Sequence, residues 1–263
     1  MPMSPRKRAQ LSRGIQYVLL TVIVLAVALL ADWATIQEVF FDPQILRAMW
    51  PDVITTALKN TVLYTACGFA FGLVLGLVLA LMRLSPVGPY RWLATGFIEF
   101  FRGVPALVVF IAFGLGVPLA FQREVPGGTL GVATLALGMV GGAYMAETIR
   151  AGIQAVPRGQ MEAARSLGMP HGRAMISIVI PQAFRIILPP LTNELILLTK
   201  DSSLIYVLGY TAATLELTAL GREVLNQEKN LTPLVGIGLC YLMITIPLSI
   251  VVRRMEARAE KAR

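Results

Sequence analysis

The chain has 263 residues, of which 56% are hydrophobic and only 14% are charged. Soluble globular domains carry about 25% charged residues, so this composition excludes an ordinary soluble domain and indicates a protein folded in a lipid bilayer. The basic residues behind the formal net charge of +8 lie at the ends of apolar runs, and no aromatic-basic platform accompanies them, so we expect no nucleic-acid partner.

Six apolar runs are long enough to cross a membrane, and we expect each to be a helix. The first, at 15–31, follows a basic segment as the core of a secretory signal would. No small-residue cleavage site precedes Asp32, so we expect a retained span. The other expected spans cover residues 53–82, 93–121, 129–149, 176–198 and 231–252.

The basic residues give these spans one orientation. The N-terminal segment, the loops at 83–92 and 150–175 and the tail at 253–263 are rich in Lys and Arg, as cytoplasmic segments usually are. The acidic loop at 32–52 and the short loop at 122–128 then lie outside. The sequence therefore predicts an all-α, multi-pass membrane protein with both termini in the cytoplasm.

Two glycine patterns predict where helices approach closely. Gly68, Gly72 and Gly76 recur every four residues in the second span, and Gly138 and Gly142 have the same spacing in the fourth. Small residues at this spacing line one helix face and let two helix backbones come together. The alternative is that the glycines are scattered by chance.

Ionisable groups inside apolar spans are costly and are therefore candidate functional residues. Glu99 and Arg102 are three residues apart, as are Glu147 and Arg150, which predicts an ion pair on one helix face in each case. We expect both pairs at the inner ends of their spans, either as structural pairs or as part of a gate. Pro105 is expected to disrupt the helix after the first pair.

The fifth span carries a double proline followed by polar residues. Pro189-Pro190 is expected to break the backbone hydrogen-bond ladder, which membrane helices tolerate where the backbone lines a cavity. Thr192, Asn193 and Glu194 would then face a translocation pathway, with an interhelical hydrogen bond as the alternative for Glu194. At the external end, Lys200-Asp201-Ser202-Ser203 either lines the outer pathway or forms a solvated loop.

A short polar helix is expected between the fourth and fifth spans, on the cytoplasmic side. Residues 160–167 are good helix formers, and Gly168 suits the C-terminal cap. Met161, Ala164 and Leu167 fall at i, i+3 and i+6 and form a small apolar stripe. Because a helix of this length is marginal alone, it must pack on the membrane surface or on a soluble partner.

Several short motifs are spaced as in one protein family. They are Glu162-Ala-Ala-Arg-Ser-Leu-Gly168, Ile180-Pro-Gln-Ala-Phe-Arg185, Glu99-Phe-Phe-Arg-Gly-Val-Pro105, Lys200-Asp-Ser-Ser-Leu204 and Asn230-Leu-Thr-Pro233. The first two resemble the EAA loop of ABC importer permeases, and the third resembles a marker of the polar amino-acid branch of that family. The resemblance implies a five-helix type I core, to which the first span is an addition.

The resemblance also implies how the chain is organised and what it contacts. It places a transmembrane domain at 53–252, with the coupling loop at 157–185, between an N-terminal unit at 1–52 and a charged tail at 253–263. Its expected partners are two ABC ATPase subunits, a second identical or sister permease, an external substrate-binding protein and the bilayer of a bacterial cytoplasmic membrane. The residues implied to contact the ATPase are Glu162, Ala163, Ala164 and Gly168.

No bound cofactor and no catalytic group are expected on this chain. It lacks the G-x-x-x-x-G-K-[ST] motif, so ATP and Mg²⁺ are expected on the partner ATPase. His171 is the only histidine, and Cys67 and Cys240 lie inside apolar runs, so we expect neither a metal site nor a disulfide. The alternative functions are an ion-coupled secondary carrier of small polar solutes and, less favoured, a membrane enzyme.

Overall fold

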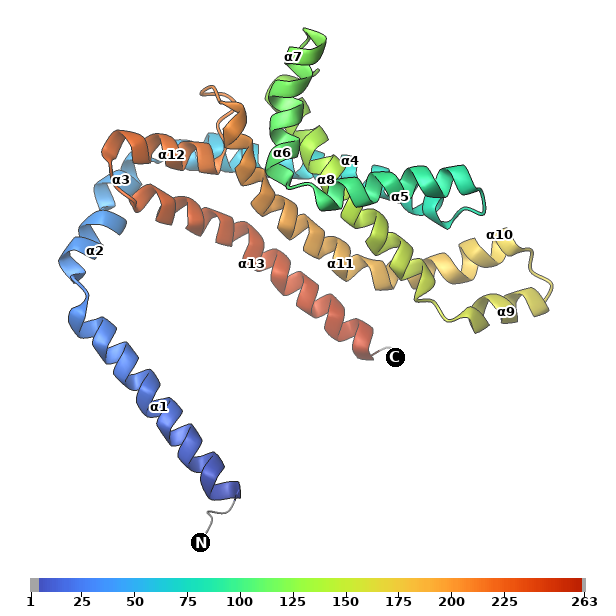
Figure 1. Cartoon of the computed structure of the whole chain (residues 1–263), viewed down its shortest axis with the longest axis horizontal. Helices are drawn as coiled ribbons and strands as arrows, with labels where there is room; N and C mark the ends of the chain where they lie inside the picture. The colour runs from blue at the N-terminus through green and yellow to red at the C-terminus, as the bar shows by residue number, and fades with distance from the viewer. Residues whose placement is uncertain (1–4, 262–263) are drawn as a thin grey trace.

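Helices and the short turns and loops that connect them make up residues 5–261, the part that the computed structural model describes, and no strand occurs there (Figure 1). Five continuous helical segments are long and apolar enough to cross a membrane. A sixth candidate span consists of two helices that meet at an angle of 105°. The continuous spans are Ser12–Leu30, Val53–Leu84, Gly128–Gln154, His171–Leu208 and Thr232–Arg258, and the bent pair is Gly88–Gly103 with Ala106–Phe121.

The elements are numbered in chain order, and the long helices are given first. They are α1 (Pro5–Leu30), α4 (Lys59–Leu84), α5 (Gly88–Gly103), α8 (Gly128–Gln154), α11 (Ile180–Asp201) and α13 (Thr232–Lys261). The shorter ones are α2 (Trp33–Phe40), α3 (Pro43–Ala48), α6 (Ala106–Ile111), α7 (Val117–Phe121), α9 (Arg158–Ser166), α10 (His171–Ala174) and α12 (Leu217–Glu228). Wider π-helical turns occur at η1 (Val53–Leu58), η2 (Ala112–Gly116) and η3 (Met175–Val179), and a 3₁₀ turn at η4 (Ser202–Leu208).

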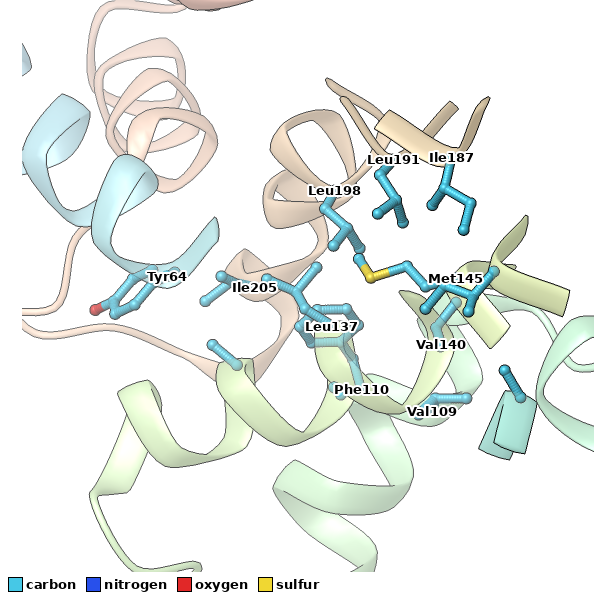
Figure 2. Close-up of a cluster of buried hydrophobic side chains, with 14 of the residues drawn as sticks. Tyr64, Val109, Phe110, Leu137, Val140, Met145, Ile187, Leu191, Leu198 and Ile205 are labelled. Atoms are coloured by element: carbon cyan, nitrogen blue, oxygen red, sulfur yellow. The ribbon is translucent and has the colours of Figure 1, made fainter. Parts of the chain in front are cut away.

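Helix α8 is the central span of the bundle. In the most apolar part of α8, 61% of the residues are buried. The corresponding share is 33% for α4 with η1, 17% for α13 and zero for α1. Figure 2 shows Leu198 and Leu191 of α11 pointing toward Met145 and Val140 of α8, with Phe110 of α6 in the same cluster. Since α4, α6 and α11 all pack on α8, a displacement of α8 acts on the whole core.

Glycines bring α4 and α8 together, as their spacing predicted. A Cβ on Gly76 would lie 3.0 Å from the carbonyl oxygen of Gly142, and one on Gly138 would lie 3.1 Å from the carbonyl oxygen of Gly68. Contacts this short leave no room for a side chain between the backbones. The prediction that both glycine faces permit close approach is therefore confirmed.

The third apolar run does not form one straight span. Helix α5 ends at Gly103, Val104 is extended at φ −91° and ψ 132°, and α6 begins at Ala106. Pro105 causes the turn, because it lacks an N–H and disfavours a helical conformation for the residue before it. The predicted disruption at Pro105 is confirmed, and it bends the chain by 105°.

Pro189-Pro190 removes two donors from the backbone hydrogen-bond ladder, as predicted, but it does not interrupt the helix. Both prolines lie inside α11, which continues from Ile180 to Asp201. Ile187 and Leu191, on either side of the pair, are buried in the cluster with α8. The packing on both sides thus holds the segment helical despite the lost backbone donors.

The segments between the spans hold more helix than their composition suggested. The expected external loop at 32–52 contains α2 and α3, and the mixed segment at 199–230 contains η4 and α12. Helix α13 continues without a break to Lys261, so the charged tail is helical as far as the structure describes it. In Figure 1, α1 stands apart from the remaining helices.

Candidate functional site

Helix α9 has the C-terminal cap that its sequence predicted. It runs from Arg158 to Ser166, and Gly168 adopts a left-handed conformation at φ +84°. The N–H of Met169 donates to the Ala164 carbonyl at 3.1 Å, and the N–H of Gly168 donates to the Arg165 carbonyl at 3.0 Å. These two bonds make a Schellman cap, which needs a residue tolerant of positive φ at Gly168.

The apolar stripe predicted for α9 divides between the core and the surface. Ala164 is 5% exposed and Met161 packs against the main cluster, whereas Leu167 is 85% exposed. Leu167 turns outward because the helix ends at Ser166, one residue before it. The inner part of the stripe thus packs on the domain, whereas Leu167 is an apolar side chain at the molecular surface.

The other residues implied for ATPase contact lie on the free surface around that side chain. Glu162, Ala163 and Gly168 are exposed, and only Ala164 is buried against the domain. The Nε2 of Gln182 lies 3.5 Å from the Oε1 of Gln160, which ties α9 to the start of α11. A rigid helix with one packed side and one open side is thus fixed at the end of the bundle.

The ion pair predicted between Glu147 and Arg150 is confirmed. The Nη2 of Arg150 donates to the Oε2 of Glu147 at 2.7 Å, and Arg83 of α4 also donates to Glu147. The ion pair predicted between Glu99 and Arg102 is wrong. Glu99 lies 3.8 Å from Arg83, and the Arg102 guanidinium lies 5.5 Å from the centre of the Tyr144 ring. Arg83 accounts for the difference, since it reaches both α5 and α8 and takes the place of Arg102.

The polar residues predicted for the pathway take separate positions. Because α11 is continuous, Thr192, Asn193 and Glu194 point in three directions. Thr192 donates to the Leu188 carbonyl at 2.9 Å and lies 4.0 Å from the Met255 sulfur of α13. Asn193 is exposed, and Glu194 lines a cavity.

The stretch predicted at the outer end of the fifth span is helical. Ser202 is fully buried and donates to the Thr199 carbonyl at 2.7 Å, so the expectation of a solvated loop is wrong for it. Lys200 is exposed, Ser203 is partly buried, and Asp201 lines the same cavity as Glu194.

That cavity lies at the bend between α5 and α6, and residues of α8 and α11 line its other sides. Its volume is about 420 Å³. Its charged and aromatic lining is Arg102, Tyr144, Glu194 and Asp201. Residues from three distant parts of the sequence thus meet at one place, and we name it the bend cavity.

A further buried carboxyl, Glu216, was missed by sequence reasoning. It is 1% exposed and accepts from the N–H groups of Thr218 and Ala219, each at 2.7 Å, at the start of α12. Burial raises the pKa of Glu216 to about 7, outweighing these bonds and the Tyr241 hydroxyl at 3.4 Å. Glutamate is a weak N-cap signal compared with Ser, Thr, Asp or Asn, so no local pattern indicated this role.

A helical bundle that crosses the membrane, encloses a charged cavity and presents a rigid surface helix has the parts of a membrane transport protein. Residues 72–261 match the model of the family described as the binding-protein-dependent transport system inner membrane component, and the chain belongs to this family. The expected resemblance to ABC importer permeases is thereby confirmed.

Individual relatives agree with the family. The chain is 40% identical to the probable glutamine ABC transporter permease GlnM of Bacillus subtilis, over 77% of this chain and 91% of that protein. It is 35% identical to the arginine transport system permease ArtQ of the same organism, over 78% of this chain and 91% of that protein. A chain of a solved structure, an amino acid ABC transporter with histidines, matches at 36% identity and a TM-score of 0.72. The match covers 82% of this chain and 98% of that one.

A more distant structure supports the fold alone. A chain of the MetNI methionine ABC transporter matches at a TM-score of 0.66 with 17% identity, over 80% of this chain and 97% of that one. Together these matches do not favour the secondary carrier considered above.

Proposed function

We propose that the chain is the transmembrane permease subunit of an ATP-driven importer for polar amino acids. Its relatives in B. subtilis are named as permeases for glutamine and arginine, which supports this substrate class. The observation that carries the coupling role is α9, a capped helix whose outer face is free. It follows α8, the most buried span, after only three residues.

The proposed coupling uses the open side of α9. Glu162, Ala163 and Gly168 would contact the ATPase together with Leu167, while Ala164 seats the helix on the domain. When the ATPase moves α9, the direct connection passes the displacement to α8 and the helices packed on it. The chain then supplies the pathway and the coupling element, and ATP with Mg²⁺ is used by the partner.

The proposed assembly contains two ATPase subunits, a second identical or sister permease and an external substrate-binding protein. The proposed orientation places α9 and both termini in the cytoplasm, supported by the Lys and Arg clusters at these segments. In Figure 1, α9, α10 and the C-terminal end of α13 lie toward the same side. Residues 53–252 form the proposed transport domain, and the bend cavity forms part of its pathway.

Reconstitution tests this function. The permease, its ATPase and its binding protein are placed in liposomes, and the uptake of labelled amino acids is measured with and without ATP. We expect uptake only with ATP and all subunits present. Uptake by the permease alone, without ATP, would contradict the importer function and restore the secondary carrier.

A further inference from the structure

Helix α2 is an amphipathic helix just after the first span. Trp33, Ile36 and Phe40 fall at i, i+3 and i+7 and share one face, whereas Glu38 lies on the opposite face. The Trp33 and Phe40 side chains are 56% and 38% exposed, and α2 contains no buried residue. The rest of the domain thus leaves this face uncovered, and we name Trp33, Ile36 and Phe40 the α2 stripe.

The length of α2 limits how it can meet a membrane. The helix has 8 residues. At 1.5 Å per residue it extends about 12 Å, far less than the roughly 30 Å of a hydrocarbon core, so it cannot cross the bilayer. A short amphipathic helix can instead lie in the plane of the membrane surface, with its apolar face toward the acyl chains.

The connection to α1 places the α2 stripe at a membrane boundary. The apolar stretch of α1 ends at Leu30, and α2 begins at Trp33. Leu29 and Leu30 are 81% and 85% exposed, so the α2 stripe continues the exposed apolar surface of α1. The Nε1 of Trp33 donates to the Ala28 carbonyl at 2.7 Å. This bond gives a donor to a carbonyl in the last turn of α1, where helical partners run out and hydrocarbon offers none.

The other end of α2 is fixed at the start of α13. The N–H of Leu231 donates to the Val39 carbonyl at 2.9 Å. The Nδ2 of Asn230 donates to the Glu38 carbonyl at 2.8 Å. The candidate span of α13 begins at the next residue, Thr232. Both ends of α2 therefore adjoin the ends of spans (Figure 1), which places the helix along one surface of the membrane.

We propose that the α2 stripe docks into the lipid bilayer at the boundary between headgroups and acyl chains. Tryptophan is enriched at this boundary because its ring is apolar and its N–H is polar. The sequence of α2, WATIQEVF, contains one acidic residue and no basic one. It therefore offers nothing to attract an anionic headgroup. The partner that fits is the apolar layer beneath zwitterionic headgroups.

This surface is separate from the transport machinery proposed above. The match to the permease family begins at residue 72, well after α2. A soluble protein would be the other possible cover for the α2 stripe. The neighbouring Leu29 and Leu30 favour lipid, because they belong to a candidate span and form one apolar surface with Trp33.

The test is fluorescence quenching in single-tryptophan variants of the full-length permease in phosphatidylcholine nanodiscs. The chain has 3 tryptophans, and Trp33, Trp50 and Trp92 are each replaced by Phe. Phe40→Trp then places the reporter on the α2 stripe. Glu38→Trp places it on the opposite face of the same helix and is the matched control. Both positions are exposed, so neither substitution disturbs the packed core.

Two quenchers distinguish the two environments. One is phosphatidylcholine brominated near the headgroup end of its acyl chains, and the other is acrylamide in the water. We expect the brominated lipid to quench F40W several-fold more strongly than E38W. Acrylamide should quench E38W more strongly than F40W, because the bilayer shields the indole of F40W from water.

The native Trp33 provides a second measurement without any change in α2. A chain that keeps Trp33 and carries only Trp50→Phe and Trp92→Phe should be quenched by the brominated lipid and shielded from acrylamide. If F40W does not assemble into nanodiscs, this chain still decides the question.

Three results would overturn the inference. Equal quenching of F40W and E38W by the brominated lipid would mean that α2 has no lipid-facing side. Free access of acrylamide to F40W or to Trp33 would place the α2 stripe in water. Shielding of F40W from both quenchers would mean that a protein surface covers the α2 stripe. The importer function would stand in each case, because the uptake assay does not depend on α2.

Discussion

Gly72 of α4 and Gly138 of α8 face each other so closely that a Cβ on Gly72 would lie 3.1 Å from the Gly138 carbonyl oxygen. The same Cβ would lie 3.2 Å from the Gly142 nitrogen. The obstructing atoms belong to the backbone, which cannot move aside as the tip of a flexible side chain can. This contact fixes the position of α8, the helix that carries Tyr144 and leads to α9.

Gly72→Ala should therefore destabilise the permease by about 1–3 kcal/mol, the usual cost of overpacking a closely packed site. The measurement is the free energy of unfolding in a detergent titration. Gly238→Ala in α13 is the control, because nothing lies within 4 Å of its added Cβ. A Gly72 variant as stable as the Gly238 variant would mean that α4 and α8 separate without cost.

Ala163→Asp should weaken binding of the ATPase and leave the permease folded. Ala163 is exposed on α9, so the new carboxylate meets water in the free permease and is buried only when the ATPase covers it. We expect a drop of about tenfold or more in ATPase affinity, measured by co-purification and by titration in detergent. The control is Ala257→Asp on the exposed end of α13, and equal ATPase binding by the two variants would refute the docking role.

Glu147→Gln should cost more stability than Glu99→Gln. Glu147 pairs with both Arg83 and Arg150, and its side chain is 20% exposed, whereas that of Glu99 is 60% exposed at 3.8 Å from Arg83. Removing the shared carboxylate leaves partly buried guanidinium groups without their partner, which costs about 1–3 kcal/mol. The exposed pair should contribute less than about 1 kcal/mol. Equal losses in thermal unfolding would contradict this ranking.

Glu216 should make the permease less stable as the pH rises from about 5 to about 7. Its pKa is raised from 4.5 to about 7, chiefly by burial. In this window the folded state holds a proton that the unfolded state releases, so its contribution to stability is complete below pH 4.5 and is lost through pH 7. The loss is on the order of 3 kcal/mol, measured by thermal unfolding across the pH range.

Glu216→Gln tests this assignment directly. The amide cannot ionise, so the variant should lose the fall in stability between pH 5 and 7 that the native chain shows. Glu228→Gln, at an exposed position of the same helix, should keep the native pH profile. A native profile in the Glu216 variant would assign the titration to another group.

The parts of the fold that follow from local patterns were predictable. Apolar length indicated the spans, glycine spacing indicated the contact of α4 with α8, and Gly168 indicated the end of α9. Pro105 likewise indicated a disruption, because its effect on the backbone depends on few neighbours. The angle of the resulting bend depends on the packing of α6 against distant helices, and no local pattern contains it.

The arrangement of charges could not be predicted, because spacing within one helix says nothing of what another helix brings. Arg83 of α4 pairs with Glu99, and the Arg102 guanidinium lies over the Tyr144 ring instead. The continuity of α11 through Pro189-Pro190 could not be predicted for the same reason, because packing on α8 holds that segment helical. The bend cavity joins Arg102 to Glu194 across the fold, and only the three-dimensional structure brings them together.

No residue in the apolar stretch of helix α1, Ser12–Leu30, is buried. Those 19 residues span about 28 Å at 1.5 Å per residue, close to the hydrocarbon thickness of a bilayer, about 30 Å. A helix with no buried residues can change its tilt when its apolar length differs from the thickness of the bilayer. The first span can therefore follow changes in membrane thickness without passing strain to α8.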